Sequence, residues 1–161
     1  MEVRNKVRGI AHDTDVAKVT VLGVPDQPGI AASIFNSLAD SGINVDTIVQ
    51  NASVERITDL TFTVGRNDLG RAMGLVEPLA SSIGAKGCTN DPKLAKVSIV
   101  GTGMASSPGY AARMFTALHA AGVNIELITT SEIRITCIIA EDHVTQAVKS
   151  LHQAFELEKA D

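Results

Sequence analysis

The fold of this chain is decided by the stretch GVPDQPGIAA at residues 23–32, because a related stretch, GTGMASSPGYAA, recurs at residues 101–112. We call these stretches the first turn and the second turn. Each follows a short β-branched run and opens an amphipathic segment. A proline suits the first position of a helix, since its missing N–H would be unpaired there anyway, so we expect Pro28 and Pro108 to begin helices. The neighbouring glycines have no side chain, so a ligand can approach the backbone closely.

The two turns belong to an internal repeat. Pro108 and Gly122 follow Pro28 and Gly42 by the same 80 residues, whereas the run AKV at residues 95–97 follows AKV at residues 17–19 by 78. The second turn therefore contains two extra residues. An internal repeat of this length has to be recognised before any other statement about the fold.

Hydrophobic periodicity predicts the same elements in both repeats. In the first repeat we expect strands at 17–24, 43–50, 56–65 and 85–89, with one helix ending at Gly42 and a second reaching about residue 83. Asn67 or Asp68 is the expected cap of that second helix, and Pro78 is expected to kink or shorten it. In the second repeat we expect strands at 95–100 and 133–140 and a helix at 143–155, with Asp142 as its candidate cap.

Each repeat therefore has the order β-α-β-β-α-β, an α+β, ferredoxin-like fold with two helices on one face of a four-stranded antiparallel sheet. The second repeat lacks a last strand, while residues 7–12 form an orphan strand before a polar turn at 12–15. We expect one domain at 16–91 and a discontinuous second domain made of 92–157 plus the strand 7–12. The alternative is that Glu156 and Leu157 form a short final strand.

Composition excludes several classes of function. The net charge is −4, aromatic residues make up 3% and tryptophan is absent, so neither a basic surface nor a stacking platform for nucleic acid is predicted. No apolar run has the roughly 20 residues that cross a bilayer, and the N-terminus lacks a signal peptide, so a cytoplasmic protein is expected. The histidines are scattered and Cys88 and Cys137 form no ligand pattern, so we expect buried thiols and no catalytic residue, metal or cofactor.

The residues of both repeats resemble a known family. The first turn, Gly42 and the run NVD at 44–46 resemble the ACT domain, a small module that senses amino acids. The resemblance becomes more specific in the runs VQN at 49–51, TDLTFT at 58–63 and above all NIELITTSEI at 124–133. These look like the regulatory region of bacterial aspartate kinase, and the likeness extends from about residue 8 to 157.

The resemblance implies a regulatory chain without catalysis of its own, since no kinase domain and no glycine-rich nucleotide loop is present. In the family this region also occurs as a β subunit beside a catalytic α subunit. A chain that starts at Met1 resembles that β subunit, although an isolated piece of a one-chain kinase would look the same. The implied partners are a second copy bound through the ACT domains and the α subunit, in an α2β2 complex. The implied effector is threonine, alone or together with lysine, which inhibits the phosphorylation of aspartate.

The resemblance places the effector between ACT domains of two chains. At the first turn its carboxylate would meet backbone N–H groups and its ammonium would meet Asp26. The expected threonine contacts are Asp26, Pro28, Gly29, Ile30, Ala31 and Gln50 of one chain, with Asn124 and Ile125 of the other. A weaker or different site is expected at Ser107, Pro108 and Gly109 with Asn44 and Val45, because Ser106 or Ser107 replaces Asp26 there.

Simpler roles exist for several of these residues. Asp26 is an alternative helix cap, Gln50 an alternative polar residue of a sheet edge, and each asparagine an alternative closure of a helix-to-strand turn. A further group of hydroxyl residues lies near the expected site and is more simply explained as strand hydroxyls: Ser53, Thr61, Thr129, Thr130 and Ser131. The alternative function is that of another ACT sensor, such as the valine-binding small subunit of acetolactate synthase.

Overall fold

The computed structural model describes residues 6–50 and 55–157, so Asn51 and Ser53 lie outside the described residues. The chain divides into two units. The inserted unit comprises residues 15–93. The split unit comprises, among the described residues, 6–14 and 94–157.

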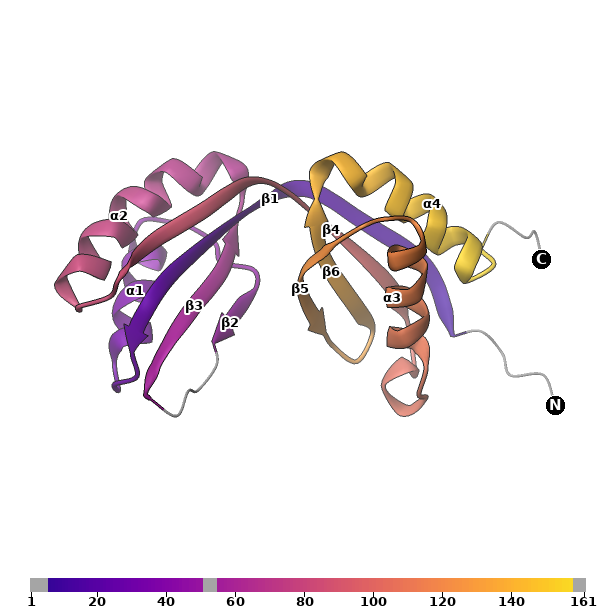
Figure 1. The fold of residues 1–161 in the computed structure, drawn as a ribbon, viewed down its shortest axis with the longest axis horizontal. Helices are drawn as coiled ribbons and strands as arrows, with labels where there is room; N and C mark the ends of the chain where they lie inside the picture. Colours follow the sequence, from indigo (N-terminus) through magenta and orange to yellow (C-terminus); the bar gives the residue numbers. More distant parts are fainter. Residues whose placement is uncertain (1–5, 51–54, 158–161) are drawn as a thin grey trace. The chain divides into compact units, whose positions relative to one another are not determined.

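The inserted unit contains two helices and four strands (Figure 1). Its elements are the second part of β1 (Val7–Pro25), α1 (Ile30–Asp40), β2 (Ile48–Gln50), β3 (Ile57–Val64), the short 3-10 helix η1 (Arg66–Asp68), α2 (Leu69–Ser82) and the first part of β4 (Gly87–Gly101). The strand order is β2-β3-β1-β4, and β3 pairs antiparallel with both β1 and β2. This is the order of a ferredoxin-like sheet.

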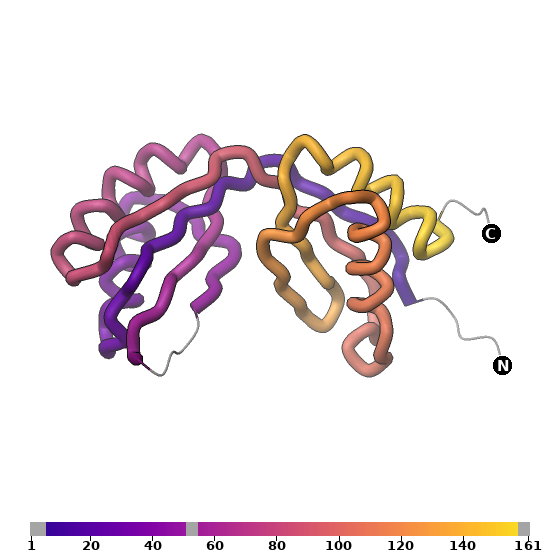
Figure 2. The backbone as a smooth tube through the Cα atoms, in the orientation of Figure 1, coloured from indigo at the N-terminus to yellow at the C-terminus, as the bar shows by residue number. Residues whose placement is uncertain are grey.

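The split unit repeats this arrangement with the second part of β4 as its first strand. After β4 come η2 (Met104–Ser106), α3 (Tyr110–Ala120), β5 (Ile125–Thr130), β6 (Arg134–Ala140), η3 (Glu141–His143) and α4 (Val144–Ala154). The strand order is β1-β4-β6-β5, so the first part of β1 supplies the fourth strand (Figure 2). Glu156 and Leu157 lie in a turn and form no strand.

In the inserted unit, alternation along the strands buries one face of the sheet against both helices. The register pairs Val19 with Phe62 and Val21 with Leu60, and all four side chains are buried. Ile34 and Leu38 of α1 pack on them together with Val76 of α2. Figure 1 shows α1 and α2 on the same side of these strands. The α+β, ferredoxin-like fold expected from the sequence is thus confirmed.

The core of the split unit is built in the same way. Val97 pairs with Cys137 and Ile99 with Ile135, and these side chains pack against Met114, Leu118 and Leu151 of the helices. Along α1 and α3 the order of buried, half-buried and exposed residues is identical. The repeat seen in the sequence is therefore also a repeat of packing.

The expected turn at 12–15 and the expected gap between the strands 85–89 and 95–100 are both absent, because β1 and β4 are each one continuous strand. The polar turn expected at 12–15 lies within the 19 residues of β1, and the expected strands 85–89 and 95–100 are parts of the 15-residue β4, which includes Pro92. Residues 12–15 are all exposed. Backbone pairing continues there while the apolar alternation stops, and the sequence pattern detects only the alternation.

The helix starts also differ from expectation. Pro28 and Pro108 do not begin helices: each precedes an N-cap glycine in the left-handed conformation, with φ of 91° at Gly29 and 100° at Gly109. Asp68 does stand at the N-cap position of α2, as expected, but no side-chain hydrogen bond among the described residues caps that helix. His143 rather than Asp142 stands at the N-cap of α4, and Asn67 lies inside η1. Pro78 neither shortens nor interrupts α2, which runs on to Ser82. Gly42 and Gly122 do end α1 and α3, each with φ of 73°.

The second strand of the first repeat is shorter than expected. Only Ile48–Gln50 form β2, although the backbone of Asp46 and Thr47 is already hydrogen-bonded to Thr63. Thr63 N–H donates to Thr47 O at 3.0 Å, and Asp46 N–H donates to Thr63 O at 3.1 Å. Residues 43–45 belong to the loop after α1, where buried Ile43 closes the core.

Candidate functional site

The first turn connects β1 to α1 and leaves the start of the helix accessible. Asp26 N–H donates to Arg56 O at 2.7 Å, which ties the turn to the start of β3. Gln27 N–H donates to Pro25 O, and Ile30 N–H reaches Gln27 O only at 3.4 Å. No side chain of the described residues caps α1, and residues 26–29 are all exposed. The turn in front of α1 is therefore exposed, and the first N–H groups of the helix carry partial positive charge.

Asp26 places a carboxylate at this helix entrance. The structure gives its side chain no role as a cap of α1, so the simpler explanation of this residue is wrong. The carboxylate is exposed and lies three residues before the N-cap Gly29. It is an acceptor beside the donors of the helix start, a combination that matches the two charges of a free amino acid.

Gln50 lies at the same end of the sheet as the first turn. It pairs with Leu60 of β3, whose other neighbour is Val21 of β1, so one strand separates it from the strand that leads into the turn. Gln50 is exposed at the end of the edge strand β2. The turn and Gln50 thus share one end of the sheet.

The remaining expected contacts lie at the loops after α1 and α3. Asn44 and Asn124 are exposed, and Val45 and Ile125 are half-buried at matching positions. Asn44 and Val45 belong to the inserted unit, Asn124 and Ile125 to the split unit. Each expected site therefore combines a turn of one unit with a loop of the other, and within one unit turn and loop lie at opposite ends of the first helix.

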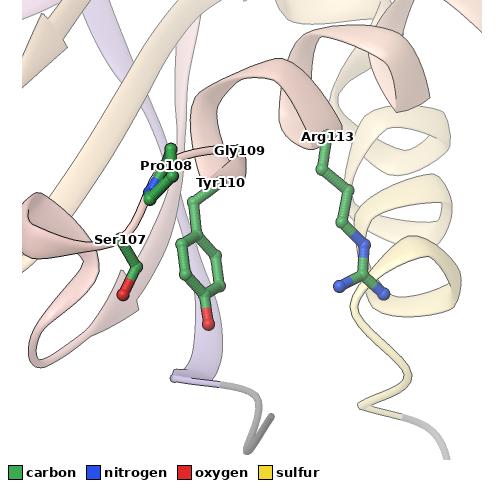
Figure 3. Close-up of a pocket in the computed structure, with 5 residues that line it drawn as sticks. All are labelled: Ser107, Pro108, Gly109, Tyr110 and Arg113. Carbon is green, nitrogen blue, oxygen red and sulfur yellow. The ribbon is translucent and has the colours of Figure 1, made fainter.

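The second turn has a different shape because of its two extra residues. They are accommodated by η2, which follows Gly103 (φ 81°) and buries Met104. Ser107 N–H donates to Met104 O at 3.1 Å. A pocket of about 430 Å³ opens beside the start of α3, lined by Ser107, Pro108, Gly109, Tyr110 and Arg113 (Figure 3).

Lys6, from the other end of the chain, contacts two of the residues that line this pocket. Its backbone N–H donates to Tyr110 Oη at 3.0 Å, and its ammonium donates to Ser107 Oγ at 2.5 Å and to Gly103 O at 3.1 Å. Gly101 permits the close packing, since a Cβ there would lie 2.0 Å from Lys6 O. Sequence reasoning missed Lys6 because about 100 residues separate it from its partners and only the strand pairing joins them.

Tyr110 and Arg113 are held by Phe155 at the end of α4. The Tyr110 ring stacks on the Phe155 ring with centroids 6.4 Å apart, and the Arg113 guanidinium lies 4.8 Å from the Phe155 centroid. Arg113 Nη2 also donates to Ala154 O. Figure 3 shows the polar ends of Ser107, Tyr110 and Arg113 pointing to the same side of the helix start.

The strand hydroxyls serve mainly the sheets. Thr61 Oγ1 lies 3.0 Å from Thr20 Oγ1 across the β1–β3 pair, and Ser98 Oγ lies 2.7 Å from Thr136 Oγ1 at the matching place in the split unit. Ser131 Oγ accepts from Arg134 N–H in the β5–β6 turn. Thr129 and Thr130 pair with Thr136 and Ile135 of β6.

The two cysteines are unlike one another. Cys137 is fully buried in β6, and burial raises the pKa of its thiol to about 12. Cys88 is half-buried and lines a pocket of about 320 Å³ with Glu77 and Lys86. Burial and, to a smaller extent, the Glu77 carboxylate raise the pKa of Cys88. Raised pKa values leave little reactive thiolate at neutral pH.

Within the described residues, no group of three or more His, Cys, Asp or Glu side chains gathers to hold a metal ion. Across the same residues, none of the helices combines the length and the apolar character needed to span a bilayer.

Comparison with known proteins identifies both units. Models of the ACT domain match residues 18–80 and residues 97–155. The aspartate kinase of Pseudomonas fluorescens is 47% identical over 152 residues, which cover 94% of this chain and 37% of that enzyme. The chain thus spans well under half the length of the curated relatives it matches.

Solved structures match over nearly their whole length. The ligand-free regulatory subunit of aspartate kinase from Thermus thermophilus superposes with a TM-score of 0.87 at 43% identity, covering 93% of this chain and 99% of that one. A chain of a structure of aspartokinase alpha and beta subunits gives a TM-score of 0.86 at 42% identity, with the same coverage.

Proposed function

The chain belongs to the family of aspartate kinase regulatory regions, built from two ACT domains, and on that premise we propose that it binds threonine at its first turn and transmits feedback inhibition to a kinase. The observation that carries the proposal is the first turn itself: an exposed turn that leads into a helix without a side-chain cap, next to the exposed carboxylate of Asp26. An amino acid would place its carboxylate on the N–H groups of Gly29, Ile30 and Ala31 and its ammonium on Asp26.

The second half of the proposed site comes from another copy of the chain. Asn124 and Ile125 of the second copy would close the pocket over the first turn, with Gln50 at its side. Edge strands support this association, because Ile48 of β2 and Ile128 of β5 are 53% and 46% exposed at positions 80 residues apart. Large apolar side chains on unpaired sheet edges favour pairing with another chain.

The decisive experiment is a thermal-shift panel with threonine, lysine, valine, isoleucine and serine. At a hundredfold excess over its dissociation constant, threonine should stabilise the chain by about 2.7 kcal/mol. Asp26→Asn should abolish this shift, since it removes the charge that meets the ammonium. Asp40→Asn, at the exposed far end of α1, is the matched control and should keep it. Stabilisation by valine instead would favour the acetolactate synthase type of sensor and refute threonine binding.

Self-association has a separate test. In saturating threonine the wild-type chain should sediment as a dimer, and Ile48→Asp should reduce that dimer to monomer because a charge replaces the exposed apolar contact. Ile48→Val keeps the apolar character and should dimerise normally. A wild-type chain that stays monomeric with threonine bound would contradict the proposed interface.

Regulation requires the catalytic partner. We expect the chain to bind an aspartate kinase α subunit in an α2β2 complex and to make its phosphorylation of aspartate sensitive to threonine, alone or together with lysine. Coupling then rests on different threonine affinities of two arrangements of the regulatory dimer. Reconstitution tests this directly: added threonine should inhibit the complex with the wild-type chain and not the complex with Asp26→Asn. At the second turn, Ser107, Pro108 and Gly109 with Asn44 and Val45 of a second copy form the proposed different site.

A further inference from the structure

We propose that the pocket at the second turn binds a small carboxylate dianion that carries no ammonium group, held by Lys6, Ser107, Tyr110 and Arg113. This inference deepens the different second site proposed above. It starts from the charges of the two turns, which are opposite. The first turn presents the carboxylate of Asp26, whereas the described residues that line the second pocket include the cation Arg113 and no acid.

Lys6 fixes the hydrogen-bonding character of the pocket. Its backbone N–H donates a hydrogen bond to Tyr110 Oη, and its ammonium donates one to Ser107 Oγ, so both hydroxyl oxygens act as acceptors. Each hydroxyl that accepts from Lys6 keeps its own proton to donate. Both hydroxyls therefore act as donors toward a ligand, and they point to the same side as the Arg113 guanidinium (Figure 3).

Lys6 and Arg113 also have donors to spare. The Lys6 ammonium has three N–H groups, of which Gly103 O and Ser107 Oγ take two. Arg113 gives one N–H to Ala154 O and rests on the Phe155 ring, which leaves its other N–H groups available. Neither Lys6 nor Glu156, the acid that follows Phe155, is among the described residues that line the pocket. Lys6 belongs to the proposed site through its hydrogen bonds to Tyr110 and Ser107.

The pocket therefore offers donors and positive charge. The ammonium group of an amino acid would bring a third positive charge close to Lys6 and Arg113. The acceptors it would meet, the hydroxyls of Ser107 and Tyr110, are neutral and already accept hydrogen bonds from Lys6. A dicarboxylate brings two negative charges to two cations, and charge-assisted hydrogen bonds of this kind are the strong ones. The volume of about 430 Å³ is ample for a small organic acid.

The chain carries a built-in reporter for this pocket. Tyr110 is the single tyrosine and tryptophan is absent, so intrinsic fluorescence comes from the pocket alone. Succinate and aspartate are the matched probes, because they differ only in the ammonium group. In low-salt buffer, succinate should change the tyrosine emission at millimolar concentrations and bind about tenfold more tightly than aspartate, the size expected for one added like-charge contact that is open to water.

Variants assign the response to the proposed residues. Arg113→Gln and Lys6→Met should each weaken succinate binding about tenfold, and Lys149→Gln, an exposed cation of α4, should leave it within about twofold. Calorimetry on Tyr110→Phe, which keeps the ring stacking, provides a second measurement should Lys6→Met fail to fold. Equal or tighter binding of aspartate, a silent succinate titration, a response to inorganic phosphate only, or an unchanged Arg113→Gln would each overturn the proposal.

The first turn is tested separately in the same samples. Asp26→Asn should lose stabilisation by threonine and keep the fluorescence response to succinate. Loss of threonine binding alone would therefore refute the proposed function, and loss of the succinate response alone would refute this inference.

Discussion

Gly29 and Gly109 hold the backbone at the start of α1 and α3 in the left-handed region, with φ of 91° and 100°. Residues with a side chain rarely adopt this conformation, and no atom lies within 4 Å of a Cβ built at either position. The requirement is therefore one of backbone conformation and not of space. Both helices begin at these glycines without a side-chain cap among the described residues.

The first prediction concerns these glycines. Gly29→Ala should lower the free energy of unfolding by about 1–2 kcal/mol, because alanine pays the cost of the left-handed backbone. Gly74→Ala is the matched control: Gly74 lies within α2, has no positive φ and has open space around its Cβ. It should raise stability by about 0.5–1 kcal/mol. Urea unfolding of both variants measures whether the free energy of unfolding falls for Gly29→Ala and rises for Gly74→Ala. A stabilised Gly29→Ala would contradict the prediction.

The second prediction concerns pH. The pKa of Cys137 is raised to about 12 from its usual 9.0, so above pH 9.0 the unfolded chain releases a proton that the folded chain retains. Stability from this group is complete below pH 9.0 and is lost by about 1.4 kcal/mol per pH unit as pH rises toward 12. Above pH 9.0 the free energy of unfolding, measured by chemical denaturation, should fall more steeply with pH for wild type than for Cys137→Ala, whereas below pH 9.0 this thiol should add no pH dependence. Parallel pH profiles would count against a buried protonated thiol.

At the scale of single residues, the features of the first turn could be predicted from the sequence alone better than those of the second pocket. Asp26 and Gly29 are neighbours in sequence, and the charge and helix entrance they form are local features. Lys6, Tyr110 and Arg113 come together only through the pairing of β1 with β4 and the docking of α4. No local pattern encodes such a contact, so the second pocket became visible only in the structure.

At the scale of elements, hydrophobic periodicity located the four main helices, whereas it misjudged the long strands. The helices have clear apolar faces, such as Ile34 and Leu38 in α1, and end at left-handed glycines. In β1 and β4 the stretches at residues 12–15 and 89–93 lie outside both cores and carry mostly exposed side chains. The backbone of these stretches is paired, but hydrophobic periodicity cannot reveal pairing between residues whose side chains are exposed.

The third prediction belongs to α2. Pro78 lies inside this 14-residue helix and has no N–H for the carbonyl of Gly74, four residues earlier. Pro78→Ala should supply that hydrogen bond and raise the free energy of unfolding by about 2 kcal/mol after the greater freedom of the unfolded chain is subtracted. Ser81→Ala, an exposed change in the same helix, should alter it by only a few tenths. Chemical denaturation measures both, and a destabilised Pro78→Ala would show that the proline is needed.

At the scale of the whole molecule, each unit has its own core, and β1 contributes to both. Val7 belongs to the core of the split unit and Val19 to that of the inserted unit, and both are buried. Substitutions at two positions of the same strand should therefore destabilise different units of the chain.

The fourth prediction uses this pair. Val7→Ala and Val19→Ala should each cost about 2 kcal/mol, from lost burial and a remaining cavity. In hydrogen exchange, Val7→Ala should speed exchange in residues 94–157, and Val19→Ala should speed it in residues 15–93. Uniform acceleration by both variants would mean that the units unfold together.

The division of the split unit has a consequence for synthesis. A ribosome that has made residue 93 has synthesised every residue of the inserted unit, whereas residues 7–14 still lack their neighbour, the part of β4 that begins at Leu94. At about 5–20 residues per second, that early segment waits for roughly 4–16 s with its backbone unpaired. Nascent chains should therefore expose the unpaired backbone of residues 7–14 throughout this interval, and we expect a co-translational chaperone to bind there.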